Sequence, residues 1–379
     1  MTIGLYIHIP FCIRKCNYCD FVSYPDRRPA TRQAYLAALE QEMAYYRQLL
    51  PEEDLQLETL YLGGGTPTCL STPELRRVLK ASRLFFTWRP GIEVTVEANP
   101  GTVDRDKMEM LKEEGVNRLS IGAQSFHPEE LLRMGRVHGV EEIRATVELA
   151  RQAGFDNISL DLIYGLPGQT LADWRRTLRE ALALAPEHLS AYGLNIEPGT
   201  PWGEMAAAGQ LIPAGEETAR AMYDEVRELC AARGYQHYEI SNYARPGYQC
   251  RHNLRYWLME PYLGLGAAAS SYYRERRWTN VEDLSEYRSL LERGKPPVAE
   301  EIRLDRRDLM AETVFLGLRT LPGVSMAAFQ AKFGVALPEI FGSQVEKLIK
   351  EKLVIVEDGH LRLTPFGLPV ANLVFQEFI

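Results

Sequence analysis

The sequence of 379 residues contains few cysteines, and their distribution excludes one class of protein. There are six, of which Cys12, Cys16 and Cys19 fall within eight residues while the others are scattered. A disulfide-stabilised secreted domain is short and dense in cysteine, so a disulfide scaffold is excluded. Clustered cysteines in a reducing compartment more often bind metal.

Long apolar runs and an excess of basic residues are also missing. No stretch approaches the roughly 20 apolar residues that span a bilayer. The N-terminus lacks the basic, apolar and small-residue regions of a signal peptide, which predicts a cytoplasmic protein without a transmembrane segment. The net charge is −8, from 43 Lys and Arg against 51 Asp and Glu. This balance argues against bulk nucleic-acid binding and against an electrostatic membrane anchor.

What the sequence does contain is a repeated pattern in its first half. Apolar residues make up 46% and charged residues 25% of the chain, as in an ordinary soluble protein of two or three domains. Short β-branched or aromatic runs alternate with loops and amphipathic helices. The predicted strands are Leu5–Ile9, Leu57–Leu62, Glu93–Ala98, Arg118–Gly122, Asn157–Ile163 and Leu189–Leu194. The predicted helices are Thr31–Tyr46, one that begins at the capping box Ser71-Thr72-Pro73-Glu74, Asp104–Glu114, Glu141–Gln152 and Leu171–Ala185.

Strands and helices that alternate at this spacing form parallel βαβ units. Six such units fit either a partial (β/α) barrel or a doubly wound sheet. In both architectures ligands bind at the carboxyl ends of the strands. Residues that follow each predicted strand are therefore the first candidates for a site.

The second half is less regular. Residues 196–300 contain a predicted helix at Glu216–Arg233, followed by a loop rich in aromatics and glycines that ends near Tyr273. From Glu301 on, helices precede a hairpin with an Asp358-Gly359 turn, which predicts a small winged-helix-like α+β domain. Residues 301–379 hold 9 basic and 10 acidic residues, which argues against a role in DNA binding.

The three clustered cysteines have the spacing C-x3-C-x2-C, in a loop directly after the first predicted strand. A complete 4Fe–4S site uses four thiolates, so three on one tight loop leave one iron atom open to an outside molecule. A structural zinc site would need a fourth ligand, for which His8 is the nearest candidate. The spacing predicts an open-site 4Fe–4S cluster, with zinc as the alternative.

Polar residues or glycines follow each of the first five predicted strands. Each alone also fits a plain turn, a helix cap or a solvated strand end. Because the carboxyl ends of parallel strands meet at one edge, together they predict a binding rim beside the cysteines. Arg136, in the loop beyond Gln124, taken alone fits a surface charge. After the cysteines, the rim consists of Gly64, Gly65, Thr66, Glu97, Gln124 and Asp161.

The cysteine loop on the first strand of a βα repeat resembles the radical S-adenosylmethionine superfamily. The resemblance implies reductive cleavage of S-adenosylmethionine to methionine and a 5′-deoxyadenosyl radical, with the cofactor supplying the chemistry. Further phrases, over nearly the whole chain, resemble the family of oxygen-independent coproporphyrinogen III dehydrogenases and their HemW-type relatives. The phrases are LYIHIPFC (5–12), GGGTPT (63–68), EANP (97–100), RLSIG (118–122) and DLIYGLPGQ (161–169).

The resemblance implies a partial (β/α)6, TIM-like radical S-adenosylmethionine barrel and a set of cosubstrate contacts. Carboxylates can take ribose hydroxyls or an amino group, and Arg136 can take a carboxylate. Tyr18 lies between two cluster ligands, so it is expected beside the adenine. The implied contacts to S-adenosylmethionine are Tyr6, Tyr18, Gly64, Gly65, Thr66, Glu97, Gln124, Arg136 and Asp161.

Two branches of the family are distinguished by sequence features that can be checked in this chain. The dehydrogenases resemble C-x3-C-x2-C-x-C and carry an N-terminal extension, whereas here Phe21 stands at the fourth cysteine position and eleven residues precede Cys12. The phrase His252-Asn253-Leu254-Arg255-Tyr256-Trp257 resembles the HemW-type branch, whose members bind heme and are implicated in its delivery. An imidazole is a common axial ligand of heme iron, and the two aromatics offer flat apolar surface. Read from spacing alone, His252 also fits a histidine that orders a loop, and Cys250 is a second candidate ligand.

We therefore expect three parts: residues 1–236 as the radical S-adenosylmethionine barrel, 237–300 as a connecting segment with the H-N-x-x-Y-W phrase, and 301–379 as the C-terminal domain. The expected function is a heme chaperone that binds heme at His252, receives electrons from a separate donor and delivers heme to hemoproteins. A homodimer is one arrangement left open. The alternatives are a coproporphyrinogen III dehydrogenase, a radical enzyme on another substrate such as a methyltransferase, and a winged-helix regulator with a redox cluster.

Overall fold

The computed structural model describes residues 2–25 and 28–379, and its larger part is built on one twelve-stranded sheet. The strands of this sheet are β1 (Thr2–Ile9), β2 (Gln56–Gly64), β3 (Thr87–Ala98), β4 (Arg118–Gln124), β5 (Ile158–Tyr164), β6 (His188–Gly193), β7 (Gln236–Glu239), β8 (Asn242–Ala244), β9 (Tyr262–Leu265), β10 (Ser270–Tyr273), β11 (Arg276–Asn280) and β12 (Val298–Arg303). The helices of this part are α1 (Pro29–Leu49), α2 (Thr72–Phe85), α3 (Arg105–Glu113), α4 (Pro128–Met134), α5 (Val140–Gln152), α6 (Leu171–Ala183), α7 (Pro201–Ala207), α8 (Glu216–Ala232), α9 (Arg251–Trp257) and α10 (Leu284–Glu292), with 3₁₀ turns η1 (Glu52–Asp54) and η2 (Pro67–Cys69).

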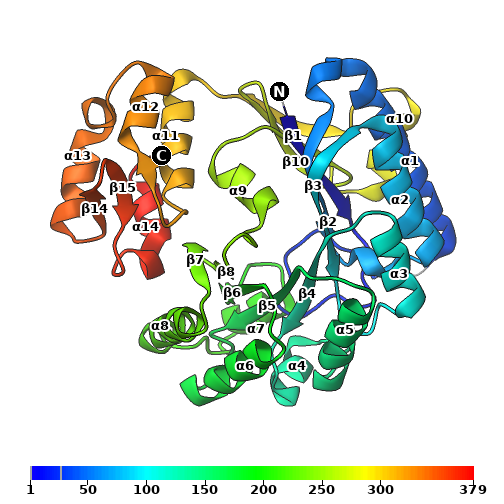
Figure 1. Cartoon of the computed structure of the whole chain (residues 1–379), viewed down its shortest axis with the longest axis horizontal. Helices are drawn as coiled ribbons and strands as arrows, with labels where there is room; N and C mark the ends of the chain where they lie inside the picture. Colours follow the sequence, from blue (N-terminus) through cyan, green and yellow to red (C-terminus); the bar gives the residue numbers. More distant parts are fainter. Residues whose placement is uncertain (1, 26–27) are drawn as a thin grey trace.

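The strand order is β12-β11-β10-β9-β1-β2-β3-β4-β5-β6-β8-β7. Strands β1 to β6 are parallel and adjacent in chain order, as connected βα units require. The order runs from one edge strand to the other and does not close on itself, and the sheet curves with helices on its outer side (Figure 1). Of the two architectures that the sequence pattern fits, this is the partial (β/α)6 barrel, as the family resemblance implies.

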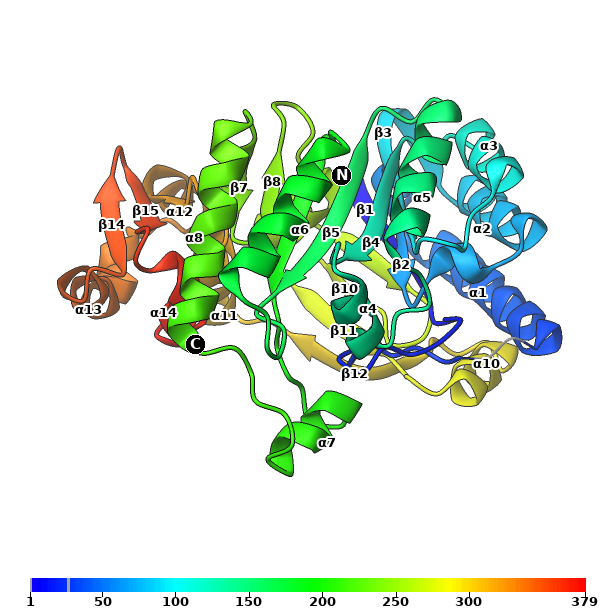
Figure 2. The same ribbon diagram turned by 90° about the horizontal axis from the view of Figure 1, so that it is seen from below.

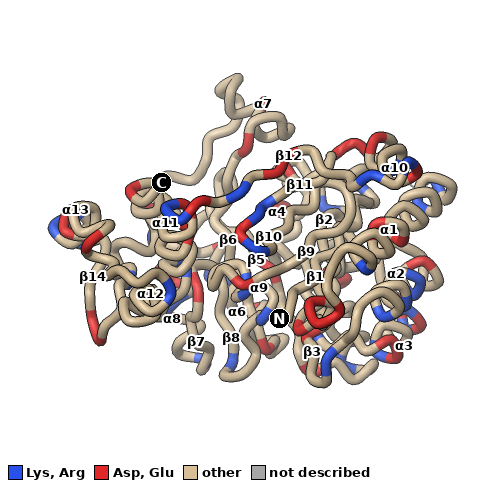
Figure 3. Tube along the Cα trace, turned by 90° about the horizontal axis from the view of Figure 1, so that it is seen from above, with Lys and Arg blue, Asp and Glu red and all other residues tan. Residues whose placement is uncertain are grey.

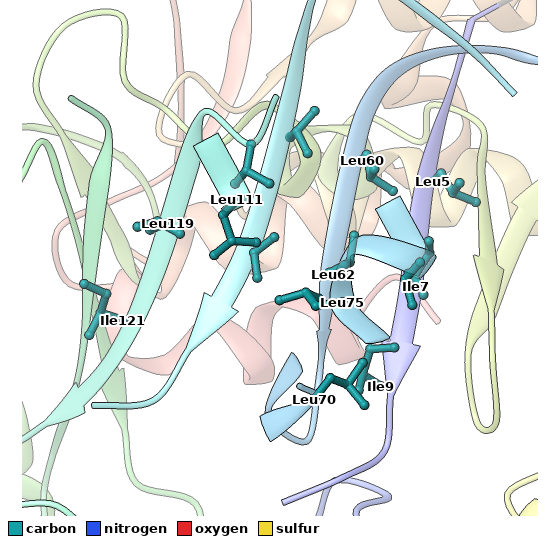
Figure 4. Packing of buried hydrophobic residues seen from close by; sticks show 14 of the residues in the cluster. Leu5, Ile7, Ile9, Leu60, Leu62, Leu70, Leu75, Leu111, Leu119 and Ile121 are labelled. Atoms are coloured by element: carbon teal, nitrogen blue, oxygen red, sulfur yellow. The ribbon is translucent and has the colours of Figure 1, made fainter. Parts of the chain in front are cut away.

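Side chains alternate between the two faces of the parallel strands. On β2, Leu60 and Leu62 are fully buried and pack beneath the helices together with residues such as Leu75 of α2 (Figure 4). Each such side chain contributes roughly 1.5–3 kcal/mol by leaving water. Tyr61, between them, faces the interior of the barrel, because successive residues of a strand point to opposite sides. The inner face is polar on every neighbouring strand, so the residues that build the core also aim polar groups into the barrel.

Residues 262–273 differ from the sequence expectation of a loop, because they form β9 and β10, and β11 follows them. β9 pairs in parallel with β1, and β10 to β12 extend the sheet by antiparallel pairing. Strands of four or five residues that pair with a strand at the other end of the chain have no local sequence signal, which explains the difference.

The antiparallel extension is attached to α1 through one buried carboxyl group. Glu42 accepts hydrogen bonds from the backbone N–H of Gly266 (2.7 Å), from Asn280 Nδ2 (2.7 Å) and from Tyr287 Oη (2.5 Å). These groups come from the β9–β10 loop, β11 and α10 respectively. Burial raises the pKa of Glu42 to about 7.

A helical domain follows the sheet and lies to one side of it (Figure 1). It contains α11 (Arg306–Gly317), β13 (Val324–Ser325), α12 (Met326–Phe333), α13 (Leu337–Lys350), β14 (Val354–Glu357), β15 (His360–Leu363), η3 (Leu368–Val370) and α14 (Ala371–Gln376). Its three strands form a separate sheet in the order β13-β15-β14, and the Asp-Gly hairpin predicted from the sequence joins β14 to β15. Lys and Arg are interspersed with Asp and Glu over its helices (Figure 3). In residues 2–25 and 28–379, no helix combines the length and apolarity that crossing a membrane requires.

Candidate functional site

A cavity of about 440 Å³ opens beside the cysteine loop, at the carboxyl ends of the parallel strands. It brings together the three clustered cysteines and most of the residues that the sequence predicts as cosubstrate contacts. Those that line it are Cys12, Cys16, Cys19, Tyr18, Gly64, Gly65, Thr66, Glu97, Gln124, Arg136 and Asp161.

Tyr6 is the predicted cosubstrate residue that is not among the cavity-lining residues. Its hydroxyl lies 3.0 Å from His8 Nδ1, and its ring stacks on Tyr61 with centroids 6.2 Å apart. Tyr61 does line the cavity, so Tyr6 lies behind it and supports the wall.

The cysteine loop is packed directly against the glycine loop that ends β2. The backbone N–H of Gly65 donates to Ile9 O (2.9 Å), and that of Thr66 donates to Phe11 O (2.8 Å). A Cβ atom on Gly65 would lie 2.7 Å from Phe11 O and 3.0 Å from Cys12 Sγ, closer than such atoms pack. Glycine at this position therefore lets the two loops approach and leaves the Cys12 thiol room.

The donor set fits an iron–sulfur cluster better than zinc. His8, the candidate fourth zinc ligand, has both ring nitrogens engaged, with Tyr6 Oη at 3.0 Å and Val22 O at 2.8 Å. Within residues 2–25 and 28–379, no three His, Cys, Asp or Glu side chains converge as they stand into a site for one metal ion. A 4Fe–4S cluster with one open iron would need three thiolates, which is the number that this loop carries.

Arg136 is part of the site rather than a surface charge. Its Nη1 lies 3.5 Å from Cys16 Sγ, and its Nη2 donates to Gly122 O (2.8 Å) and to Asn99 Oδ1. Asn99 Nδ2 in turn donates to Thr66 Oγ1 at 2.6 Å. These contacts hold the Arg136 cation beside the Cys16 thiol. They also join the carboxyl ends of β2, β3 and β4.

Two half-buried carboxyl groups face the interior of the barrel and line the cavity. Glu97 accepts from Tyr61 Oη (2.8 Å) and from the backbone N–H of Gly64 (3.1 Å), and Asp161 accepts from Ser120 Oγ (2.8 Å) and Ser159 Oγ (3.0 Å). Burial raises the pKa of Glu97 to about 7, and the nearby charge of Asp161 adds to the effect. Burial also raises the pKa of Asp161. Carboxyl groups held in this way are suited to ribose hydroxyls or an ammonium group.

Gln124 ends β4 with φ of 65°, in the left-handed region that side chains other than glycine seldom adopt. The same strand shifts its register against β5 between Ile121 and Gln124. Strained backbone of this kind is typical of functional sites. Here it turns the amide side chain toward the cavity.

Sequence reasoning did not single out four other cavity residues: Tyr61, Asn99, Cys69 and Tyr192. Tyr61 precedes Gly63 by two positions, so period-two alternation could have placed both on one face. Asn99 lies inside the EANP phrase but was not assigned a role. Cys69 and Tyr192 carry no local signal.

His252 lies apart from the cavity, in the helix α9. Its side chain is 1% exposed, with Nδ1 2.8 Å from Thr59 Oγ1 and Nε2 2.8 Å from Tyr256 Oη. Burial lowers its pKa to about 3. Cys250 is also buried, with its thiol 3.7 Å from a carboxylate oxygen of Glu93.

Comparisons with known proteins agree with this geometry. A model of the radical SAM superfamily matches residues 6–181, and a model of the HemN C-terminal domain matches residues 304–370. The heme chaperone HemW of Bacillus subtilis is 38% identical over 375 residues, which cover 99% of this chain and 98% of the relative. The chain belongs to the HemW family. A second HemW, from Escherichia coli, is 40% identical over 271 residues, which cover 70% of this chain and 69% of the relative.

The fold of this HemW family member is shared with a solved radical SAM enzyme. Coproporphyrinogen III oxidase (HemN) from Escherichia coli aligns over 99% of this chain and 89% of its own with a TM-score of 0.87 and 26% identity. The predicted cluster and cosubstrate residues, from Tyr6 to Asp161, all fall within the superfamily match. Membership of this family implies a 4Fe–4S cluster and S-adenosylmethionine, and the donor set described above fits both.

Proposed function

We propose that this protein is a heme chaperone that binds heme, a 4Fe–4S cluster and S-adenosylmethionine, and delivers heme to hemoproteins. The observation that carries the proposal is the likeness to HemW of Bacillus subtilis over nearly the full length of both chains. Phe21 adds support, because it stands where the dehydrogenase branch has a fourth cysteine and is 65% exposed beside the cavity.

In this proposal Cys12, Cys16 and Cys19 hold the cluster. An open-site cluster supplies one-electron chemistry to a cosubstrate chelated at its free iron. The protein's own part is to orient the cosubstrate: Glu97 and Asp161 take its hydroxyl or amino groups, and Arg136 takes its carboxylate. A separate protein supplies the electrons.

We further propose that heme contacts the segment that contains His252. In the conformation described here both ring nitrogens are hydrogen-bonded within the protein, so iron ligation by His252 requires the ring to leave Thr59 and Tyr256. Cys250 is the alternative ligand. Heme added to the protein is expected to give a Soret band, which His252→Ala weakens and Cys250→Ala leaves unchanged. The reverse pattern would move the ligand to Cys250, and a band unaffected by both would place it elsewhere.

The second candidate function is oxygen-independent coproporphyrinogen III dehydrogenase, which the likeness to HemN favours. The two functions separate in one anaerobic assay with coproporphyrinogen III, S-adenosylmethionine and a reductant. The chaperone proposal expects no decarboxylation above the level of a Cys16→Ala control. Robust formation of protoporphyrinogen IX would replace it.

We place the protein in the cytoplasm, because an exposed open-site cluster needs a reducing compartment. Cell fractionation with an antibody against the chain tests this placement. A homodimer is the oligomeric arrangement that we propose for the cluster-loaded form. Light scattering with and without cluster tests it, and a monomer in both forms would exclude it.

A further inference from the structure

We infer that His252 is a positioning residue for the S-adenosylmethionine site, and that it acts through Tyr61 on Glu97. The inference rests on the proposed binding of S-adenosylmethionine in the cavity. It concerns the heme-free protein, in which the His252 ring keeps its contacts with Thr59 and Tyr256.

The contact chain runs from α9 to the wall of the cavity. The His252 ring stacks on the Tyr61 ring, with centroids 5.2 Å apart and planes 27° apart. Tyr61 donates its hydroxyl hydrogen to Glu97 Oε1 at 2.8 Å. Tyr61 and Glu97 line the cavity, whereas His252 does not.

Two aromatic rings pack on Tyr61, those of His252 and Tyr6. Tyr6 is its lateral neighbour on β1, with ring centroids 6.2 Å apart, and His252 packs on it from α9. Its hydroxyl is the one side-chain donor that the described residues supply to Glu97, whose other oxygen accepts from the backbone N–H of Gly64. Release of Tyr61 would leave the half-buried Glu97 carboxyl group with one partner fewer, and such a loss is costly.

His252 is itself fixed from three sides, as a positioning residue must be. Thr59 and Tyr256 bind its two ring nitrogens. The carboxylate of Glu93 accepts from the backbone N–H groups of His252 and Arg251, both at 3.0 Å, and so caps the start of α9.

One turn further along the same face of the helix, Arg255 ties α9 to the N-terminal ends of the strands. Arg255 donates to Glu58 Oε2 (3.0 Å) and to Thr2 O (2.9 Å). A Cβ atom on Gly4 would lie 2.9 Å from Thr59 Oγ1 and 3.0 Å from Arg255 Cδ, so a glycine is needed for this approach. Helix α9 therefore holds the imidazole in one place beneath Tyr61.

A double-mutant cycle tests the inference on cluster-loaded protein, with equilibrium binding of S-adenosylmethionine as the readout. We expect Tyr61→Phe and His252→Ala each to weaken binding about tenfold, the size of one lost hydrogen bond to a charged group. If His252 acts through the Tyr61 hydroxyl, His252→Ala adds little once that hydroxyl is gone. The double variant should therefore bind like Tyr61→Phe alone. Additive losses, or no loss in His252→Ala, would overturn the inference.

Two further variants separate positioning from plain packing. His252→Phe keeps a flat ring on Tyr61 and should bind S-adenosylmethionine within about twofold of wild type, although both hydrogen bonds of the imidazole are lost. His237 of β7 provides the control, because it is a half-buried histidine whose ring stacks on Tyr243 at 4.4 Å and it does not line the cavity. His237→Ala should lower stability and leave the affinity unchanged. If His237→Ala weakened S-adenosylmethionine binding equally, the effect of His252→Ala would reflect general destabilisation, and the inference would be overturned.

Failure of the wild-type protein to bind S-adenosylmethionine would remove the cosubstrate from the proposed function, and the inference with it. Should His252→Ala not load its cluster, His252→Leu takes its place in the cycle, because it fills the volume without a flat ring.

Discussion

At the scale of single residues, Cys69 raises the question of which thiols bind the cluster. It lines the same cavity as the loop cysteines and lies close enough to Cys12 to influence its pKa. We expect Cys16→Ala to lose the 4Fe–4S cluster, because two thiolates on the loop cannot hold it, and Cys69→Ser to keep it. Iron and sulfide analysis with EPR of the reduced protein measures this. A cluster retained in Cys16→Ala, or lost in Cys69→Ser, would change the ligand set.

At this scale the sequence predicts a site residue when its role follows from neighbouring positions in the chain. The cysteine spacing and the polar residues after each strand are local signals, and the structure gathers most of them in one cavity. The place of Arg136 beside Cys16 could not be predicted, because it depends on contacts with Asn99 and Gly122 of other strand ends. The setting of His252 between Thr59 and Tyr61 depends on pairs almost two hundred residues apart in the chain.

At the scale of elements, the buried carboxyl group of Glu42 makes the attachment of α1 to the sheet extension sensitive to pH. Burial raises its pKa to about 7, above the value of about 4.5 expected in the unfolded chain. The stability gained by keeping it protonated is therefore complete below about pH 4.5 and is lost as the pH rises through about 7. We expect the difference in free energy of unfolding between wild type and Glu42→Gln to fall from pH 5 to pH 8 and then to level off.

Chemical denaturation across this range measures the difference at each pH. Taking the difference removes the contribution of buried histidines, whose pKa values burial lowers and which titrate in the same range. Glu286→Gln, on the exposed side of α10, is the control and should leave the pH dependence unchanged. A pH-independent difference for Glu42→Gln would show that this carboxyl group does not titrate in the range.

Whether a strand could be predicted from the sequence depends on how far apart in the chain its interacting residues lie. Strands β1 to β6 were predictable because each carries its own apolar alternation and is followed by its own helix. The short strands β9, β10 and β11 were not predictable, because they are stabilised by pairing with β1 and with one another and not by a pattern in their own sequences. The likeness to HemN over nearly the whole chain shows that this extension belongs to the shared fold.

At the scale of the whole molecule, the C-terminal domain is joined to the barrel where β7 turns into β8. Backbone hydrogen bonds run from Ile240 N to Arg319 O (3.1 Å) and from Leu321 N to Tyr238 O (3.0 Å). The Arg319 guanidinium lies 4.2 Å from the centre of the Trp257 ring at the end of α9. Figure 1 shows α9 between the two parts. The H-N-x-x-Y-W segment therefore contacts the C-terminal domain through its tryptophan and the cavity wall through its histidine.

The charge of Arg319 also acts on the buried Glu239, which accepts hydrogen bonds from Asn242 and the backbone N–H of Ser241, and this gives the junction a pH dependence that can be measured. Burial raises the pKa of Glu239 to about 7, while the charge of Arg319 opposes the rise. At pH 8 the carboxylate is ionised and the nearby cation favours that form, so Arg319→Ala should lower the free energy of unfolding by about 2 kcal/mol. At pH 6 Glu239 is largely protonated, and the loss should shrink to about 1 kcal/mol, the contribution of the guanidinium stacked on Trp257. Urea unfolding at both values measures the two losses, with the exposed Arg307→Ala as a control that changes neither. An equal loss at pH 6 and pH 8 would mean that Arg319 secures the junction through the aromatic contact alone, because a carboxylate that needed the cation would make the loss grow with pH.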